Sequence, residues 1–122
     1  MAKHKQLLGK LGENLAADFL ISKGFEILER NFRTAWGEID LIVRDSNQIV
    51  FVEVKTRTST NFGMPEEAVT QKKQQHLINS AQEYIENHAA GLENYRIDVI
   101  SILMKPEKNH NPEIEWFENA IS

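Results

Sequence analysis

The stretch EIDLIVRDSNQIVFVEVKTR, residues 38–57, decides the fold. Two runs rich in β-branched and apolar residues, 38–44 and 49–57, flank the polar segment 45–48. Strand-forming runs on either side of a short polar segment are typical of a β-hairpin. The sequence therefore predicts two antiparallel strands that meet at a tight turn.

The register of this hairpin brings acidic side chains together. With a loop of two or four residues at the tip, Asp40 faces Glu53, and Glu38 faces Lys55. Directly opposed side chains stand about 4.5 to 5.5 Å apart at Cβ, where like charges are destabilising unless something offsets them. A hard cation such as Mg²⁺ can do so, since it takes carboxylate oxygens and keeps waters for a phosphate-bearing substrate. Asp40 and Glu53 are therefore candidate metal ligands.

Strand periodicity places Glu53, Lys55 and Arg57 on one face of the second strand, together with Ile49 and Phe51. An exposed face with ordinary cross-strand ion pairs would give the same Glu-x-Lys pattern, and that pattern alone favours this simpler interpretation. Here, however, the charged residues share their face with two large apolar ones. Charges are seldom placed on such a partly covered surface without a role, so we favour a metal site.

The segments outside the hairpin complete an α-β-β-β-α-β order, followed by a weaker fifth strand. The predicted elements are helices over 3–23 and from Pro65 to about His88, and strands over 25–32, 95–104 and 114–117. Gly24 is placed to end the first helix. The apolar spacing predicts buried stripes on the two helices, at Leu8, Leu11, Leu15, Phe19 and at Val69, Leu77, Ala81, Ile85.

A strand, a helix and a further strand in succession favour a right-handed crossover. The second hairpin strand and the strand after Tyr95 should therefore be parallel neighbours. The predicted fold class is α/β, with a mixed central β-sheet and flanking helices. A length of 122 residues is that of one domain, spanning 1–122.

Composition excludes several classes of protein. With 41% hydrophobic and 26% charged residues the chain resembles a soluble globular domain rather than a disordered one. The absence of cysteine excludes disulfides and thiolate zinc sites. Gly-rich phosphate loops are also absent, so no nucleotide cofactor is expected. No apolar run is long enough for a signal peptide or a membrane span, so we expect a cytoplasmic protein.

Charge is distributed unevenly along the chain. The net charge of -4 argues against an indiscriminate nucleic-acid binder. Residues 1–58 carry 9 basic and 8 acidic side chains, a balance of +1, whereas residues 59–122 carry 5 and 10, a balance of -5. Any phosphate-binding face should draw mainly on the first half.

These residues resemble a known superfamily. Asp40 followed by Glu53-x-Lys55 on a hairpin, after a helix bearing Glu13, resembles the restriction-endonuclease-like (PD-(D/E)XK) nucleases, which share the α-β-β-β-α-β order. Ile39 stands where that superfamily often has proline. More narrowly, four blocks resemble the YraN family, poorly characterised bacterial proteins similar to archaeal Holliday-junction resolvases: RNFR at 30–33, GEIDLI at 37–42, VFVEVKTR at 50–57 and FGMP at 62–65.

The resemblance implies roles for individual residues. Asp40 and Glu53 would bind the metal, with Glu13 as a further ligand from the helix, and Lys55 would hold or activate the attacking water. A solvated helical glutamate is an equally good interpretation of Glu13 from the pattern alone. The small residues Gly9, Gly12 and Ala16 on the same face would let the helix lie close to the sheet.

Four basic residues are candidates for contact with the sugar-phosphate backbone: Arg30, Arg33, Arg57 and Lys73. For each of them, a solvated surface charge is the simpler interpretation. Lys73 is preferred over Lys72 because the resemblance to the YraN family implies a lysine at this position of the helix.

Two further residues receive structural interpretations. Asp98, between apolar neighbours, should be a buried acid paired with Arg96 or a backbone amide. Trp36 precedes Gly37 at the mouth of the hairpin, where base stacking is conceivable but packing is the better default.

The resemblance implies a restriction-endonuclease-like domain that acts as an Mg²⁺- or Mn²⁺-dependent endonuclease, hydrolysing phosphodiester bonds in branched or structured DNA. The alternative is a non-catalytic nucleic-acid-binding or scaffolding module that keeps the fold, because nuclease folds also occur in inactive binding modules. In both cases the expected partner is DNA, with no membrane, and a homodimer is left open.

Overall fold

The computed structural model describes residues 2–46, 48–58, 69–89, 94–104 and 111–122. The FGMP block at 62–65 and the predicted helix start at Pro65 lie outside these residues. Among the described residues, no helix is both long and apolar enough to cross a membrane.

The described elements form one five-stranded sheet in the order β1-β2-β3-β4-β5, with two helices. Their bounds are α1 Ala2–Ser22, β1 Glu26–Thr34, β2 Gly37–Asp45, β3 Gln48–Arg57, α2 Gln71–His88, β4 Tyr95–Leu103 and β5 Glu113–Ile121. β3 and β4 are parallel, and the other neighbours are antiparallel. The predicted mixed α/β sheet and its parallel crossover are confirmed, and β5 is longer than the predicted 114–117.

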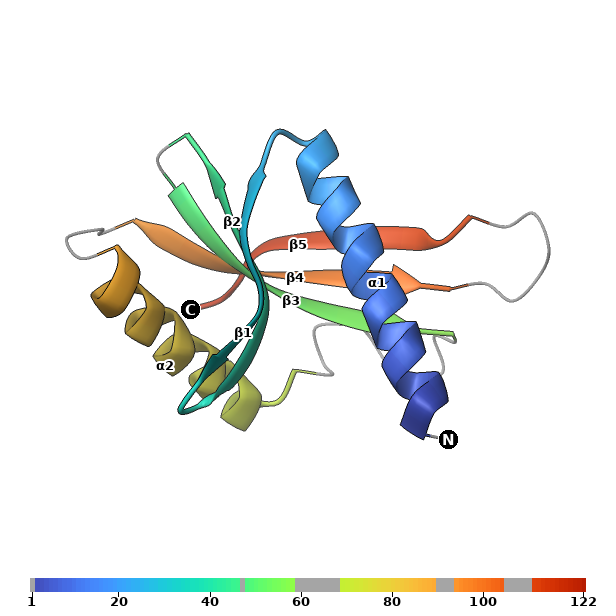
Figure 1. The fold of residues 1–122 in the computed structure, drawn as a ribbon, viewed down its shortest axis with the longest axis horizontal. Coiled ribbons are helices and arrows are strands. Elements are labelled where there is room, and N and C mark those ends of the chain that lie inside the picture. Colours follow the sequence, from blue (N-terminus) through green and yellow to red (C-terminus); the bar gives the residue numbers. More distant parts are fainter. Residues whose placement is uncertain (1, 47, 59–68, 90–93, 105–110) are drawn as a thin grey trace.

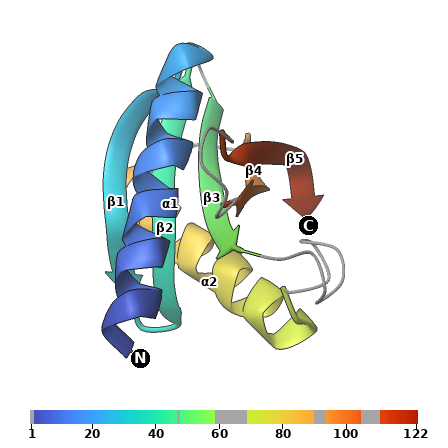
Figure 2. The ribbon, with the colours of Figure 1, turned by 90° about the vertical axis from the view of Figure 1, so that its right-hand side faces the viewer.

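The two helices cover opposite faces of this sheet. Ile49 and Phe51 of β3 belong to the core cluster that contains residues of α2, whereas Val50 and Val52 belong to the cluster that contains residues of α1. Figures 1 and 2 show the strong twist of the sheet, with β5 running across the direction of β1 and β2. The predicted alternation of β3 is confirmed, so Glu53 and Lys55 lie on the α2 side.

The contact face of α1 confirms the predicted stripe in part, because Leu15 and Phe19 pack against the core cluster on this side of the sheet. Leu11 is 49% exposed, and the buried residues are Gly12, Ala16, Ala17 and Leu20. Gly12 lies so close to β3 that a Cβ there would overlap the Thr56 side chain. The small residues around Gly12 let the helix approach the sheet closely, as the Gly9–Gly12–Ala16 spacing indicated.

The ends of the helices follow local rules. Gly24 takes φ +95 after α1, a conformation that costs glycine little, so the predicted stop is confirmed. α2 begins at Gln71 rather than near Pro65, because Thr70 is its N-cap and accepts a hydrogen bond from the Lys73 N–H. The predicted burial of Leu77 and Ala81 is confirmed.

Asp98 ties β4 to β5. Its buried carboxylate accepts hydrogen bonds from Arg96 Nε at 3.0 Å, Trp116 Nε1 at 2.9 Å and the Asn119 N–H at 2.8 Å. The structural interpretation of this acid is therefore confirmed. Both oxygens of the carboxylate accept hydrogen bonds from residues of β4 and β5, so Asp98 is not a candidate metal ligand.

We predict opposite effects for alanine at two glycines of α1. Gly12→Ala should destabilise the fold by about 1 to 3 kcal/mol, because the new methyl group meets Thr56 in a packed contact. Gly9→Ala should stabilise it by up to about 1 kcal/mol, because no described atom lies within 4 Å of the new Cβ and alanine favours the helix. Urea unfolding of both variants tests this, and equal effects would contradict the close approach of α1.

Candidate metal centre

The candidate site lies where β2 and β3 stop pairing. Their register runs from Asp45↔Gln48 to Leu41↔Val52, as predicted, around a two-residue loop. The paired residues end one step before Asp40 and Glu53. There the Asp40 carboxylate accepts a hydrogen bond from the Val54 N–H at 2.8 Å. The strands around the predicted pair Asp40 and Glu53 are therefore joined by the Asp40 side chain, which reaches across to β3. The predicted pair Glu38 and Lys55 lies beyond the regular register.

The alternation of β2 also breaks at Asp40. Leu41 belongs to the core cluster on the α1 side, yet Ile39 and Ile42 both belong to the cluster on the α2 side. On the neighbouring strand β1, Asn31 lies between the pairs formed by residues 30 and 32 and has φ +53, a conformation that asparagine tolerates better than most residues. These irregularities turn the Asp40 side chain toward β3.

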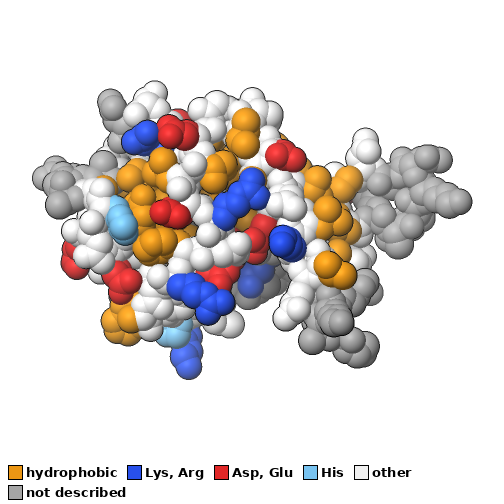
Figure 3. Space-filling view, viewed as in Figure 1, with side chains coloured by type: hydrophobic (Ala, Val, Ile, Leu, Met, Phe, Trp, Pro, Cys, Tyr) orange, Lys and Arg blue, Asp and Glu red, His pale blue; other side chains and the backbone are white. Residues whose placement is uncertain are grey.

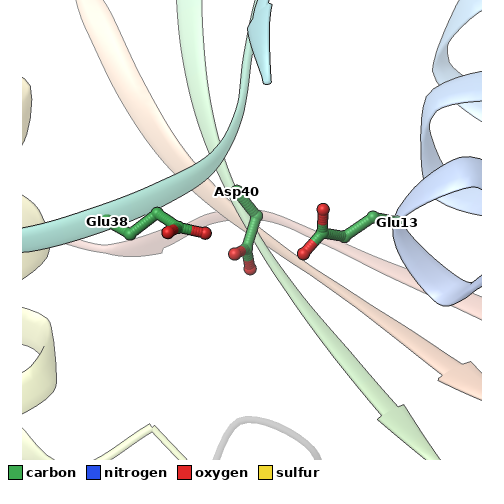
Figure 4. Close-up of side chains that lie close together, drawn as sticks. All are labelled: Glu13, Glu38 and Asp40. Atoms are coloured by element: carbon green, nitrogen blue, oxygen red, sulfur yellow. The ribbon is translucent and has the colours of Figure 1, made fainter. Parts of the chain in front are cut away.

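Three carboxylates converge at this gap, and we call Glu13, Glu38 and Asp40 the acidic triad. Each offers one oxygen, and these oxygens all lie within 4.8 Å of one another. Figure 4 shows Glu38 and Asp40 projecting from β2 and Glu13 reaching toward them from α1. The close approach of α1 at Gly12 is what brings Glu13 within reach.

Glu53 lies beside the triad and is 3% exposed. Its carboxyl group hydrogen-bonds with that of Asp40. Lys73 Nζ stands 3.4 Å from Glu53 Oε2, close enough for an ion pair but without hydrogen-bond geometry, so this buried oxygen has no hydrogen-bond partner among the described residues. A buried carboxylate oxygen without a hydrogen bond is costly and is suited to receiving a further ligand.

Burial and like charges raise the pKa of two members of the triad. Burial, the hydrogen bond with Glu53 and the charges of Glu53 and Glu13 raise the pKa of Asp40 to about 9 against the lowering by the Val54 N–H. Burial also raises the pKa of Glu13, which Glu38 and Glu53 raise further, while Asn31 and Arg30 lower it. The site thus holds more acid than its own cations neutralise.

The predicted basic residues surround this site unequally. Lys73 pairs with Glu53, and Arg30 donates to Asn14, the neighbour of Glu13, at 2.8 Å. Arg33 is largely exposed, 4.0 Å from Glu38. In Figure 3, basic and acidic side chains lie next to one another near the middle of the face shown.

Lys55 and Arg57 occupy the end of β3. Lys55 is half-buried on the same side of the strand as Glu53, and makes no ion pair with a described residue. Arg57 is half-buried and pairs with Leu103 in the parallel register with β4. Both predicted side chains thus follow Glu53 along one face of the strand.

Sequence reasoning missed two participants. It assigned no ligand role to Glu38, although the Glu38-x-Asp40 spacing puts a second acid two residues away on one strand. It also missed Asn31, which hydrogen-bonds the Glu13 side chain. Asn31 has φ +53 within β1, and the sequence holds no pattern that predicts this conformation.

The donor set fits a hard divalent cation. All ligand atoms are carboxylate oxygens, which Mg²⁺, Mn²⁺ and Ca²⁺ prefer over nitrogen or sulfur. Three such oxygens already lie within mutual reach, and Glu53 adds a buried one beside them. The arrangement can therefore hold a cation next to a group of basic side chains.

Comparison with known proteins identifies close relatives. The model of the uncharacterised protein family UPF0102 matches residues 12–102. A UPF0102 protein from Caldanaerobacter subterraneus subsp. tengcongensis is 50% identical over 118 residues, covering 97% of each chain. A UPF0102 protein from Caldicellulosiruptor saccharolyticus is 45% identical over 118 residues, covering 97% of this chain and 99% of its own.

Among solved structures, this chain is similar to SfsA from Pyrococcus furiosus, determined in complex with Ca²⁺. The match has a TM-score of 0.42 and 17% sequence identity, and it covers 93% of this chain and 63% of that one.

We predict that cation affinity rises with pH. In the cation-free protein Asp40 holds a proton up to about pH 9, and a bound cation must displace it. Calorimetric titration with Mn²⁺ between pH 6 and 8 should show affinity that increases by up to about tenfold per pH unit, with proton release. Asp40→Asn should abolish binding, while Asp18→Asn, an exposed acid on the same protein, should not. Equal affinity of wild type and Asp40→Asn would contradict the site.

The raised pKa of Asp40 also predicts how the stability of the cation-free protein depends on pH. The ordinary pKa of Asp40 is 3.8, and the folded value is about 9, so the folded protein binds more protons than the unfolded chain between these limits. This contribution to stability is complete below pH 4 and is lost as pH rises toward 9. Urea unfolding in EDTA should show a steeper decline with pH for wild type than for Asp40→Asn, and parallel curves would be inconsistent with the raised pKa.

Proposed function

The chain belongs to the UPF0102 family, which is the YraN family that its sequence blocks resemble, and we propose that it is a metal-dependent endonuclease acting on branched or otherwise structured DNA. One observation carries the proposal. Carboxylates from α1, β2 and β3 gather at a gap in the sheet, next to lysines of β3 and α2.

The acidic triad and Glu53 would hold the cation. A divalent ion bound to them would supply a positive charge that polarises a phosphoryl oxygen and lowers the pKa of a bound water. Asp40 is fixed for this role by the Val54 N–H, and Glu13 by its hydrogen bond to Asn31. Such fixed ligands need little rearrangement when the cation arrives.

Lys55 has a separate task in this proposal. It follows Glu53 on the same face of β3, and no ion pair with a described residue neutralises it. Its ammonium group can hold the attacking water by hydrogen bonding and can stabilise negative charge that develops on the phosphoryl group. This supports a role in the reaction rather than in binding the cation.

Backbone contacts would come from the basic residues around the acids. Arg30 and Arg33 on β1 and Lys73 on α2 are all at least partly exposed, so they can meet phosphates without large rearrangement. Arg57 continues this set along β3. With a net charge of -4, such local contacts favour a shaped substrate over long duplex, to which binding should be weak and should depend only shallowly on salt concentration.

A second candidate is a non-catalytic DNA-binding module. The ion pair between Lys73 and Glu53 favours it, because one buried acid is then neutralised by the chain itself. Cleavage assays separate the two. Labelled junction, flap, single-stranded and duplex DNA would be incubated with Mg²⁺ or Mn²⁺, with Asp40→Ala as the inactive control.

We predict that Lys55→Ala lowers the single-turnover cleavage rate about 100- to 1,000-fold at saturating Mg²⁺, as does loss of one group that stabilises transition-state charge. Cation affinity should change little, because Lys55 is not a ligand. Lys72→Ala, an exposed lysine of α2, is the matched control and should cleave normally. Equal rates for wild type and Lys55→Ala would remove Lys55 from the reaction, and no cleavage by wild type would favour the binding module.

A further inference from the structure

Trp36 is exposed at the turn between β1 and β2. The sequence favoured packing for this residue, but it is 48% exposed, unlike Trp116, which packs edge-on against two phenylalanines. The turn lies beside α2 (Figure 1). A tryptophan in such a position offers a large flat surface to a ligand.

The backbone that carries Trp36 is held in place. Thr34 Oγ1 accepts the Trp36 N–H at 3.0 Å and donates to the Gly37 carbonyl at 3.0 Å. The same hydroxyl is 2.7 Å from Ser80 Oγ of α2, which is buried. The exposed indole ring therefore extends from a turn that is hydrogen-bonded to α2. Because the backbone of this turn is already ordered, it loses little conformational entropy when a ligand stacks on the ring.

A hollow separates Trp36 from the first turns of α2. Its volume is about 150 Å³, and it is lined by Trp36, Glu38, Lys73, His76, Leu77 and Ser80. A cavity of about this volume holds one benzene ring, whereas drug-sized ligands need roughly 300 Å³ or more. The hollow is thus suited to a single small aromatic group with polar edges.

Two lining residues connect the hollow to the candidate metal centre. Glu38 belongs to the acidic triad, and Lys73 pairs with Glu53. A group stacked on Trp36 would therefore be directly beside the acids. Lys73 and His76 can donate hydrogen bonds to a phosphate or to the edge of a base.

A second hollow that Trp36 also lines is unsuited to a nucleic acid backbone. Its volume is about 200 Å³, and its other lining residues are Asn79, Gln82, Glu83 and Glu86. Its two carboxylates would repel phosphates. The strand should therefore run on the Lys73 side, toward the acidic triad.

We propose that the hollow between Trp36 and α2 binds one unpaired base of the DNA, stacked on the indole, next to the phosphate at the acidic triad. This inference rests on the proposed function and narrows its substrate class. The substrate is DNA with an unpaired nucleotide at the cleavage point, such as a flap, a gap or a frayed junction arm, because a paired base is not free to enter.

The test measures binding in EDTA, where turnover is prevented. Two duplexes of equal length are compared, one fully paired and one with a single unpaired 2-aminopurine. Wild type should bind the second more tightly and quench its fluorescence. Trp36→Ala should lose about 5- to 150-fold in affinity for the unpaired substrate and little for the duplex, while Trp36→Phe should retain most of it. Ile21→Ala, another exposed apolar residue, is the control and should behave as wild type.

Unchanged affinity of Trp36→Ala, or an equal loss on both substrates, would overturn the base site. Circular dichroism and the Trp36→Phe variant separate these outcomes from misfolding. Adding Mg²⁺ then tests the proposed function independently. Trp36-dependent binding without cleavage would support the base site and contradict the proposed nuclease activity. Cleavage at equal rates by wild type and Trp36→Ala would support the nuclease activity and contradict the base site.

Discussion

The hydrogen bond from the Val54 N–H to the Asp40 carboxylate is the interaction on which the site depends. It lies where regular pairing of β2 and β3 ends, and it replaces a backbone bond with one to a side chain. Asp40 is thereby held in the gap between the strands, where Glu13 can reach it from the helix. A fully paired hairpin would have left these acids as ordinary residues on a sheet face.

Gathering four acids in a partly buried gap works against folding. Desolvation and like charges both raise the pKa of Asp40, and among the described contacts the four acids have two ion pairs, Glu53 with Lys73 and Glu38 with the largely exposed Arg33. Such an arrangement persists where the rest of the fold is stable enough to hold it. The two core clusters and the Asp98 network supply that stability without using any residue of the site.

Patterns of strand and turn were sufficient to predict the hairpin register, the parallel neighbour of β3 and the structural role of Asp98. For α1 they were right in part, because Leu15 and Phe19 pack against the core and Gly12 lies close to Thr56, whereas Leu11 is 49% exposed. They also missed Glu38, because the break in alternation at Asp40 depends on neighbouring strands. They also did not predict the exposure of Trp36, whose turn is held to α2 by a tertiary hydrogen bond between Thr34 and Ser80.

The central claim is that the acidic triad and Glu53 form one cation site. The most direct test is a crystal structure from protein grown with Mn²⁺, in which anomalous scattering locates the ion. The account predicts a single strong peak bounded by the carboxylates of Glu13, Glu38 and Asp40, with Glu53 beside it. Saturating Mn²⁺ with no peak among these side chains would contradict it.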